Sequence, residues 1–157
     1  MLPHNTPVRW DGLEHLRRDY MLQLTEAIER SGRQVKVAPY ALATSGDERR
    51  ADLALIARYA DAAGLRLTST SFADEGSAPP VEQRSGFCAA RRFAREGFAH
   101  GILAIARPAI TTDAEVYERV LTDLFEHRIF LAFLPIDLSS LADCRPGREV
   151  PSDQEPA

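Results

Sequence analysis

Cysteine is scarce in this chain of 157 residues, which argues against a small protein built on disulfides or on a bound metal. The two cysteines, Cys88 and Cys144, are far apart in the sequence and form no C-x-x-C pair. The four histidines are scattered as well, without the spacing of metal ligands. The sequence therefore predicts neither a disulfide framework nor a metal site.

Long apolar runs and a leader segment are also missing. The longest apolar run, 129–136, has the length of a strand and falls short of the ~18 residues that a membrane helix needs. The first residues contain neither the basic region nor the apolar stretch of a secretion signal. We therefore expect a cytoplasmic protein that does not contact a membrane.

No phosphate-binding fingerprint marks the chain as a nucleotide enzyme. Neither G-x-G-x-x-G after a strand nor G-x-x-x-x-G-K-[ST] occurs, and we expect no cofactor. The 23 acidic residues outnumber the 19 basic ones, which gives a net charge of −4. This balance argues against a general nucleic-acid coat, because binding to phosphates needs a positive surface.

The chain does contain a regular alternation of strand and helix patterns. With 45% hydrophobic residues it can build a core, and its length fits one domain. Apolar spacing predicts a first helix over 11–31, with Asp11 and Glu14 as a capping box and Gly32 at its end. Strands are predicted at 35–43, 65–72, 101–106 and 129–134.

Three further helices separate these strands. The first has Ser45 and Glu48 as a capping box, and the second covers 85–96. The third has Thr112 and Glu115 as its capping box. The β-α-β-α-β-α-β order predicts a three-layer α/β/α domain with a mainly parallel, four-stranded sheet and an extra N-terminal helix.

The domain layout follows from these elements. Residues 1–34 form an extension with the first helix, 35–136 form the α/β domain, and 137–157 form a polar tail that we expect to be disordered. The apolar stripe of helix 11–31 must be buried somewhere. We expect it to pack on the chain's own sheet, with a protein partner or a second copy of the chain as the alternative.

The turn after the first predicted strand carries a resemblance to a known family. Residues 40–45 read Tyr-Ala-Leu-Ala-Thr-Ser and precede a capped helix. This pattern resembles the start of the serine recombinase (resolvase/invertase) catalytic domain, in which Tyr-x-Arg-x-Ser supplies the serine that attacks DNA. The resemblance implies a resolvase-like fold and, for the family, site-specific cleavage and exchange of DNA strands.

The resemblance extends over about 35–134. The segments DLALIARYADAAGL and RLTSTSFADEGS are similar to the next helix, strand and Asp-containing loop of the family. The sequence RSGF at 84–87 resembles its Arg-x-Gly-Leu helix start. The segment 98–134 resembles its third strand, its Asp-Arg-Leu-x-Arg segment, and the helix and strand that follow.

The departures from the family lie where its chemistry is carried. Leu42 stands at the position of the first arginine, and Thr44 stands at that of the nucleophilic serine, with Ser45 one residue later. In the Asp-Arg-Leu-x-Arg segment, Ala109 and Thr112 stand at the two arginines. The resemblance therefore implies that three of the family's arginines are absent.

A few polar residues still match the family or lie close to a match. Asp74 and Arg84 match functional positions by type. Pro108 stands at the aspartate of the Asp-Arg-Leu-x-Arg segment, and Arg107 precedes it. The candidate catalytic residues are thus vestigial ones: Thr44, Ser45, Asp74, Arg84 and Arg107.

These replacements predict a catalytically inactive homologue. Attack on a phosphodiester builds negative charge on the phosphate and leaving oxygens, which arginines stabilise. Loss of one such donor typically costs ~10²–10³ in rate. The sequence also has no helical pattern after 137 to match the long helix and DNA-binding domain that follow in the family. We therefore expect an interaction or regulatory protein.

Two other functions stay open at this point. One is an active or accessory recombinase that uses Thr44 or Ser45 as its nucleophile. The other is a small binder of phosphates or nucleotides, with its pocket at the strand ends near Thr44, Asp74 and Arg107.

The densest basic stretch, 84–107, is the candidate for contact with phosphate or DNA. Its five arginines face Glu96 as the one acidic residue of the stretch. A solvated helix face is the plainer interpretation of such a charge run. The candidate phosphate- or DNA-binding residues are Arg84, Arg91, Arg92 and Arg107.

Overall fold

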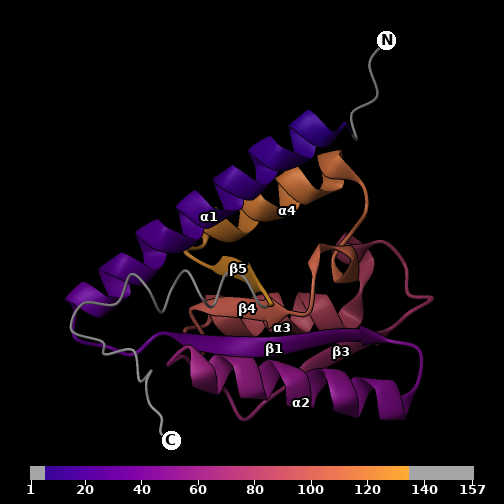
Figure 1. Cartoon of the computed structure of the whole chain (residues 1–157), viewed down its shortest axis with the longest axis horizontal. Coiled ribbons are helices and arrows are strands. Elements are labelled where there is room, and N and C mark those ends of the chain that lie inside the picture. Colours follow the sequence, from indigo (N-terminus) through magenta and orange to yellow (C-terminus); the bar gives the residue numbers. More distant parts are fainter. Residues whose placement is uncertain (1–5, 135–157) are drawn as a thin grey trace, which may run out of the picture.

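A parallel β-sheet with helices on both faces forms the centre of the molecule (Figure 1). The computed structural model describes residues 6–134. In chain order the elements are α1 (Pro7–Arg30), β1 (Lys36–Ala43), α2 (Gly46–Ala62), β2 (Arg66–Leu67), β3 (Phe72–Glu75), η1 (Val81–Gln83), α3 (Ser85–Arg95), β4 (Gly101–Ala104), η2 (Arg107–Ala109), α4 (Ala114–Glu126) and β5 (Phe130–Phe133).

Strand β1 is the central strand and pairs on both sides. The strand order is β2-β1-β4-β5, and β3 pairs with β1 further along. Lys36 lies opposite Arg66 of β2, and Tyr40 lies opposite Phe72 of β3. Every one of these pairings is parallel. The strands therefore all end at one edge of the sheet, the carboxyl edge, and all begin at the other, the amino edge.

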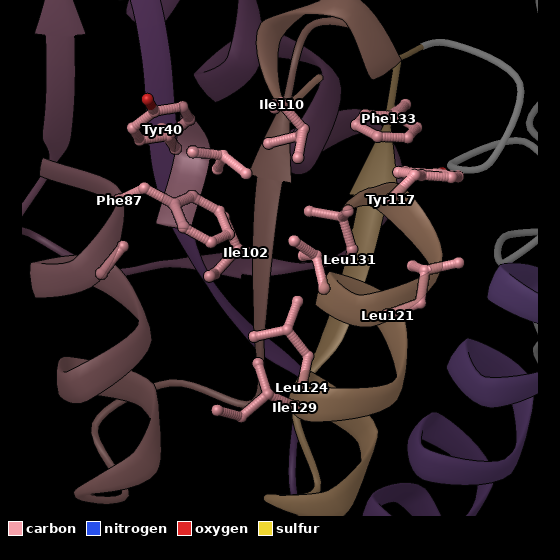
Figure 2. Packing of buried hydrophobic residues seen from close by; sticks show 14 of the residues in the cluster. Tyr40, Phe87, Ile102, Ile110, Tyr117, Leu121, Leu124, Ile129, Leu131 and Phe133 are labelled. Atoms are coloured by element: carbon pink, nitrogen blue, oxygen red, sulfur yellow. The ribbon is translucent and has the colours of Figure 1, made fainter. Parts of the chain in front are cut away.

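Two buried clusters lie on opposite faces of the sheet, because side chains alternate along a strand. In β4, Ile102 belongs to the cluster beneath α3 and α4, and Leu103 belongs to the cluster beneath α2. Figure 2 shows the first cluster, in which Phe87 of α3 and Leu124 of α4 lie around the sheet residue Ile102. The predicted α/β class, parallel sheet and coverage of both faces are confirmed.

The second predicted strand, 65–72, is wrong in its extent. Two short strands, β2 and β3, take its place, so the sheet has five strands rather than four. Between them the Thr68 hydroxyl donates to the Thr70 carbonyl at 2.8 Å, a local bond of the kind that competes with strand pairing. Pairing then resumes and continues to Glu75, so Asp74 lies in a strand and not in the predicted loop.

The first helix begins at Pro7 rather than at Asp11. Thr6 is its N-cap, and the threonine hydroxyl accepts a hydrogen bond from the Arg9 N–H at 3.2 Å. Proline fits the first helical position because that residue needs no N–H donor and its φ is already helical. The Thr-Pro pair is thus a stronger start signal than the predicted capping box at Asp11.

The other two predicted caps have different outcomes. Ser45 is the N-cap of α2, as predicted, and accepts from the Glu48 N–H at 3.1 Å. At α4 the prediction of Thr112 is wrong, because Asp113 is the N-cap. The Asp113 carboxylate accepts from two backbone N–H groups of the first turn, which a threonine hydroxyl one residue earlier cannot reach.

Helix α1 lies along β5 and beside α4, as Figure 1 shows. Its buried residues reach both clusters: Leu13 belongs to the one beneath α4, and Met21, Leu24 and Ile28 belong to the other. The helix therefore crosses the outer edge of the sheet. The predicted packing of its apolar stripe on the chain's own sheet is confirmed.

The predicted tail at 137–157, with Cys144, lies outside the described residues. Among residues 6–134, no helix is both long enough and apolar enough to cross a membrane.

Candidate functional site

A polar pocket lies at the carboxyl edge, where β1 and β3 end. Its volume is about 330 Å³. The turn from β1 into α2 supplies Thr44 and Ser45, the first turn of α2 supplies Arg49, and β3 supplies Asp74 and Glu75. This pocket is the candidate functional site, because it contains the two hydroxyl residues and the aspartate that the sequence singles out.

The Thr44 hydroxyl is already occupied by a carboxylate. It donates to Glu48 Oε1 at 2.6 Å, and the Thr44 N–H donates to the same oxygen at 2.7 Å. The hydroxyl bond, followed by the backbone bond, lowers the pKa of Glu48. Such a carboxylate is a weak base, so the pair orders the turn rather than priming Thr44 as a nucleophile.

Both carboxylate oxygens of Asp74 bind the start of α3. Oδ1 accepts from the Gly86 N–H and Oδ2 from the Phe87 N–H, both at 2.9 Å. A Cβ at Gly86 would lie 2.1 Å from the Ala73 carbonyl oxygen, so glycine is required for this close approach. Asp74 is therefore the anionic cap of α3.

Tyr40 joins Asp74 to Arg84. The buried Tyr40 hydroxyl donates to Asp74 Oδ2 at 2.9 Å and accepts from Arg84 Nη1 at 3.3 Å. Burial raises the pKa of Tyr40, with the hydrogen bond from Arg84 as the main opposing effect. The hydroxyl stays neutral and serves as a structural bridge.

Arg84 is buried beneath the loops of the carboxyl edge. Its Nε donates to the Pro79 carbonyl and its Nη1 to the Ala109 carbonyl, each at 2.8 Å. These bonds tie the loop before α3 to the loop after β4. Arg84 holds the two loops together, and it does not line the pocket that contains Thr44.

Arg107 lies in a different environment. Its guanidinium carbon is 4.0 Å from the centroid of the Trp10 ring on α1, and its buried Nε has no hydrogen-bond partner within residues 6–134. Trp10 in turn packs against Tyr117 of α4. Arg107 therefore connects η2 to α1 and does not line the pocket.

The two remaining candidate arginines are on α3. Arg91 pairs with Asp123 of α4 at 3.0 Å, and Arg92 is exposed in the last turn of the helix. Neither lines the pocket. Of the residues predicted from sequence, the structure brings together Thr44, Ser45 and Asp74 and leaves the four arginines outside.

The structure adds pocket residues that sequence reasoning missed. Arg49 lies one turn into α2, Glu75 is the last residue of β3, and Ser85 begins α3. The sequence could have identified Arg49 as a site residue, because the first turn of a helix that follows a parallel strand lies at the carboxyl edge. The charged residues that line the pocket are thus two carboxylates, Asp74 and Glu75, and one guanidinium.

No cluster of three or more metal-ligating side chains occurs in the part of the chain that the structure describes.

Comparison with known proteins gives a result at the level of the fold. No protein-family model matches the chain, and no curated protein matches its sequence. Among solved structures, the N-terminal catalytic domain of TP901-1 integrase is similar, with a TM-score of 0.56 and 16% sequence identity. The match covers 69% of this chain and 92% of that chain. At this identity the likeness concerns the fold alone, and the chain therefore has a resolvase-like catalytic-domain fold.

Proposed function

We propose that this chain is a serine-recombinase-like domain that does not cleave DNA and acts as an interaction or regulatory protein. The observation that carries the proposal is the charge around Thr44. Its hydroxyl is bonded to Glu48, and Asp74 and Glu75 line its pocket with Arg49 as the one cationic lining residue. Two carboxylates repel an incoming phosphate, which is the opposite of what strand cleavage requires.

The positions of the other arginines support the same proposal. Stabilising a pentavalent phosphate takes guanidinium donors that point at the reacting oxygens. Arg84 directs its donors at two backbone carbonyls, and Arg107 lies over the Trp10 ring. Redirecting Arg84 breaks the bonds between two carboxyl-edge loops, and redirecting Arg107 breaks its contact with α1.

The test of inactivity is a search for a covalent protein–DNA adduct. The protein is incubated with supercoiled DNA and with a nicked oligonucleotide duplex, beside an active serine recombinase that verifies the assay. We expect no adduct from this chain. A band that disappears in Thr44→Ala or Ser45→Ala would instead establish an active or accessory recombinase.

The effects of the same two variants on the fold can be predicted from the structure. Ser45→Ala removes the N-cap of α2 and should cost about 1 kcal/mol of stability. Thr44→Ala removes one of the two bonds to Glu48 and leaves the cap in place. Both variants should fold, so a band that disappears in either variant could not be attributed to unfolding.

A second candidate function, a small-anion binder, is favoured by one observation. Arg49 and Gly46, in the first turn of α2, line the pocket, and a helix N-terminus attracts anions. A thermal-shift screen with phosphate and nucleotides tests this, since a ligand at 100 times its Kd adds ~2.7 kcal/mol of stability. A shift abolished by Arg49→Gln would favour the binder over the interaction protein.

A further inference from the structure

The charges of the chain are segregated between the two edges of the sheet. The segments at the amino edge are 30–36, 61–66, 95–101 and 126–130, and they carry six Arg and Lys against three carboxylates. The segments at the carboxyl edge are 44–50, 74–85 and 105–115, and they carry four Arg against seven carboxylates. The net charge of −4 therefore conceals a basic end opposite the candidate site.

The basic residues of the amino edge form a row across adjacent strands. Lys36 of β1 lies opposite Arg66 of β2, and the Lys36 N–H donates to His100 Nδ1 at 2.9 Å on the other side. Register partners point to the same face of a sheet, so Lys36 and Arg66 share one face. Arg33, in the segment between α1 and β1, adds a third cation to this edge.

These cations have no ion-pair partner among the described residues. Within residues 6–134, none of Arg33, Lys36 and Arg66 forms an ion pair with a carboxylate. Besides burial, the positive charges of Arg33 and Lys36 lower the pKa of His100. A local positive potential therefore exists at this edge, and Arg92 and Arg95 in the last turn of α3 add to it.

An exposed aromatic side chain accompanies the basic row. Phe98, two residues before His100, is 54% exposed and stacks on Phe93 with ring centroids 5.2 Å apart. The Phe93 ring in turn packs against Phe72 of β3, with ring centroids 5.2 Å apart. Phe98 is thus an exposed ring that stacks on Phe93, which in turn is held by Phe72.

We propose that the amino edge is a binding surface for single-stranded nucleic acid. Arg33, Lys36 and Arg66 contact successive phosphates, and Phe98 stacks on an unpaired base. Unpaired cations beside an aromatic ring match the way that single strands are bound without sequence preference. The ring favours a nucleic acid over an acidic peptide, because a carboxylate chain gains nothing from a stacking surface. This surface lies at the opposite edge from Thr44 and goes beyond the proposed function.

The experiment measures binding of a fluorescent oligothymidine to the full chain by anisotropy over a series of salt concentrations. The Arg33→Gln/Arg66→Gln double variant should lower the slope of log K against log salt by about 0.7 for each phosphate that the protein no longer neutralises. Arg50→Gln/Arg119→Gln also removes two charges, from arginines that pair with Asp47 and Glu82 of the carboxyl-edge segments, and should leave the slope unchanged.

A matched pair of variants at Phe98 tests the aromatic part of the surface. Phe98→Leu should weaken binding about fivefold or more, because base–aromatic stacking is removed, whereas Phe98→Tyr should keep it. Circular dichroism verifies that each variant is folded.

Three results would overturn the proposal. One is the absence of oligothymidine binding at low salt. Another is an equal loss of binding in Arg50→Gln/Arg119→Gln and in Arg33→Gln/Arg66→Gln. The third is stronger binding to a polyglutamate peptide than to oligothymidine, which would assign the surface to an acidic protein partner. The adduct assay on Thr44 is unaffected by any of these outcomes.

Discussion

Arg84 illustrates how the contacts of one side chain determine its role. Its guanidinium donates to two backbone carbonyls and to the Tyr40 hydroxyl, with no carboxylate among these partners. Such bonds satisfy carbonyl groups that would otherwise lack donors beneath the loops. An arginine used in this way stabilises the fold of the site, and its occupied Nε and Nη1 donors are not available to a phosphate.

Asp74 is the residue whose loss should be most costly at the carboxyl edge. Asp74→Ala removes the acceptor for Gly86, Phe87 and Tyr40 in one step. We expect a loss of about 2–3 kcal/mol in the free energy of unfolding, because two backbone donors and a buried hydroxyl lose their partner. Urea denaturation measures it. Asp74→Asn, which retains one acceptor oxygen, should lose less, and equal losses in the two variants would contradict the cap assignment.

The bond between Thr44 and Glu48 makes a prediction about pH. The pKa of Glu48 lies below its ordinary value of 4.5, so its stabilising contribution is present above that value and is lost as the pH falls through the lower, folded pKa. Thr44→Val removes the hydroxyl bond and should raise the pKa of Glu48 partway back. Carbon-13 NMR titration of the carboxyl measures this. Ser45→Ala keeps both bonds, so an equal rise there would argue against the Thr44 pairing.

At the scale of elements, α1 protects the outer strand of the sheet. An edge strand exposes unpaired backbone groups that other chains can bind. Buried Arg17 of α1 donates to the Leu131 carbonyl of β5 at 3.0 Å and pairs with Glu14, while its guanidinium lies 4.9 Å from the Phe133 ring centroid. The helix thereby satisfies a backbone group at the edge of the sheet and covers it.

Replacing Arg17 should loosen this attachment. Arg17→Ala leaves Glu14 Oε1 and the Leu131 carbonyl without the Arg17 donors and creates a cavity, while Glu14 Oε2 still accepts from the Tyr117 hydroxyl, so we expect a loss of about 3 kcal/mol in stability. Arg17→Met combined with Glu14→Gln refills the volume without the charges and should recover most of it. Thermal unfolding measures both. A double variant as unstable as Arg17→Ala would show that the ion pair itself, rather than the packing, holds α1.

The elements also show what sequence reasoning can reach. Apolar periodicity and capping residues predict the order of helices and strands, since both signals are local, and the cap at Ser45 is confirmed. The break between β2 and β3 depends on pairing with β1, and a single strand pattern does not contain that information. Likewise, the sequence identifies Asp74 and Arg84 as polar residues of interest. That they bond to helix N–H groups and loop carbonyls follows only from tertiary contacts.

At the scale of the whole molecule, the buried residues of the two described clusters lie between Leu13 and Phe133. The segment 145–157 contains one β-branched residue, Val150, and no aromatic residue, so it has little apolar surface to bury. We expect deletion of 145–157 to leave the melting temperature nearly unchanged. A large fall in Tm would show that the segment contributes to the folded domain.

The segregation of charge between the two edges should be measurable on the intact chain. With a net charge of −4, an evenly charged protein would pass through a cation exchanger at pH 7. At about 0.1 M salt, however, charges are screened beyond about 10 Å, so a resin senses one end of the molecule at a time. We therefore expect the folded chain to be retained and the urea-unfolded chain, whose charges are averaged, to flow through. Lys36→Gln/Arg66→Gln should elute earlier than Arg50→Gln/Arg119→Gln. Arg119 pairs with Glu82 of the carboxyl-edge segment 74–85, so equal charge changes at different edges affect the basic end unequally. Identical elution of the two double variants would mean that the net charge of the protein, and not the arrangement of its charges by the parallel sheet, determines how strongly it binds the negatively charged resin.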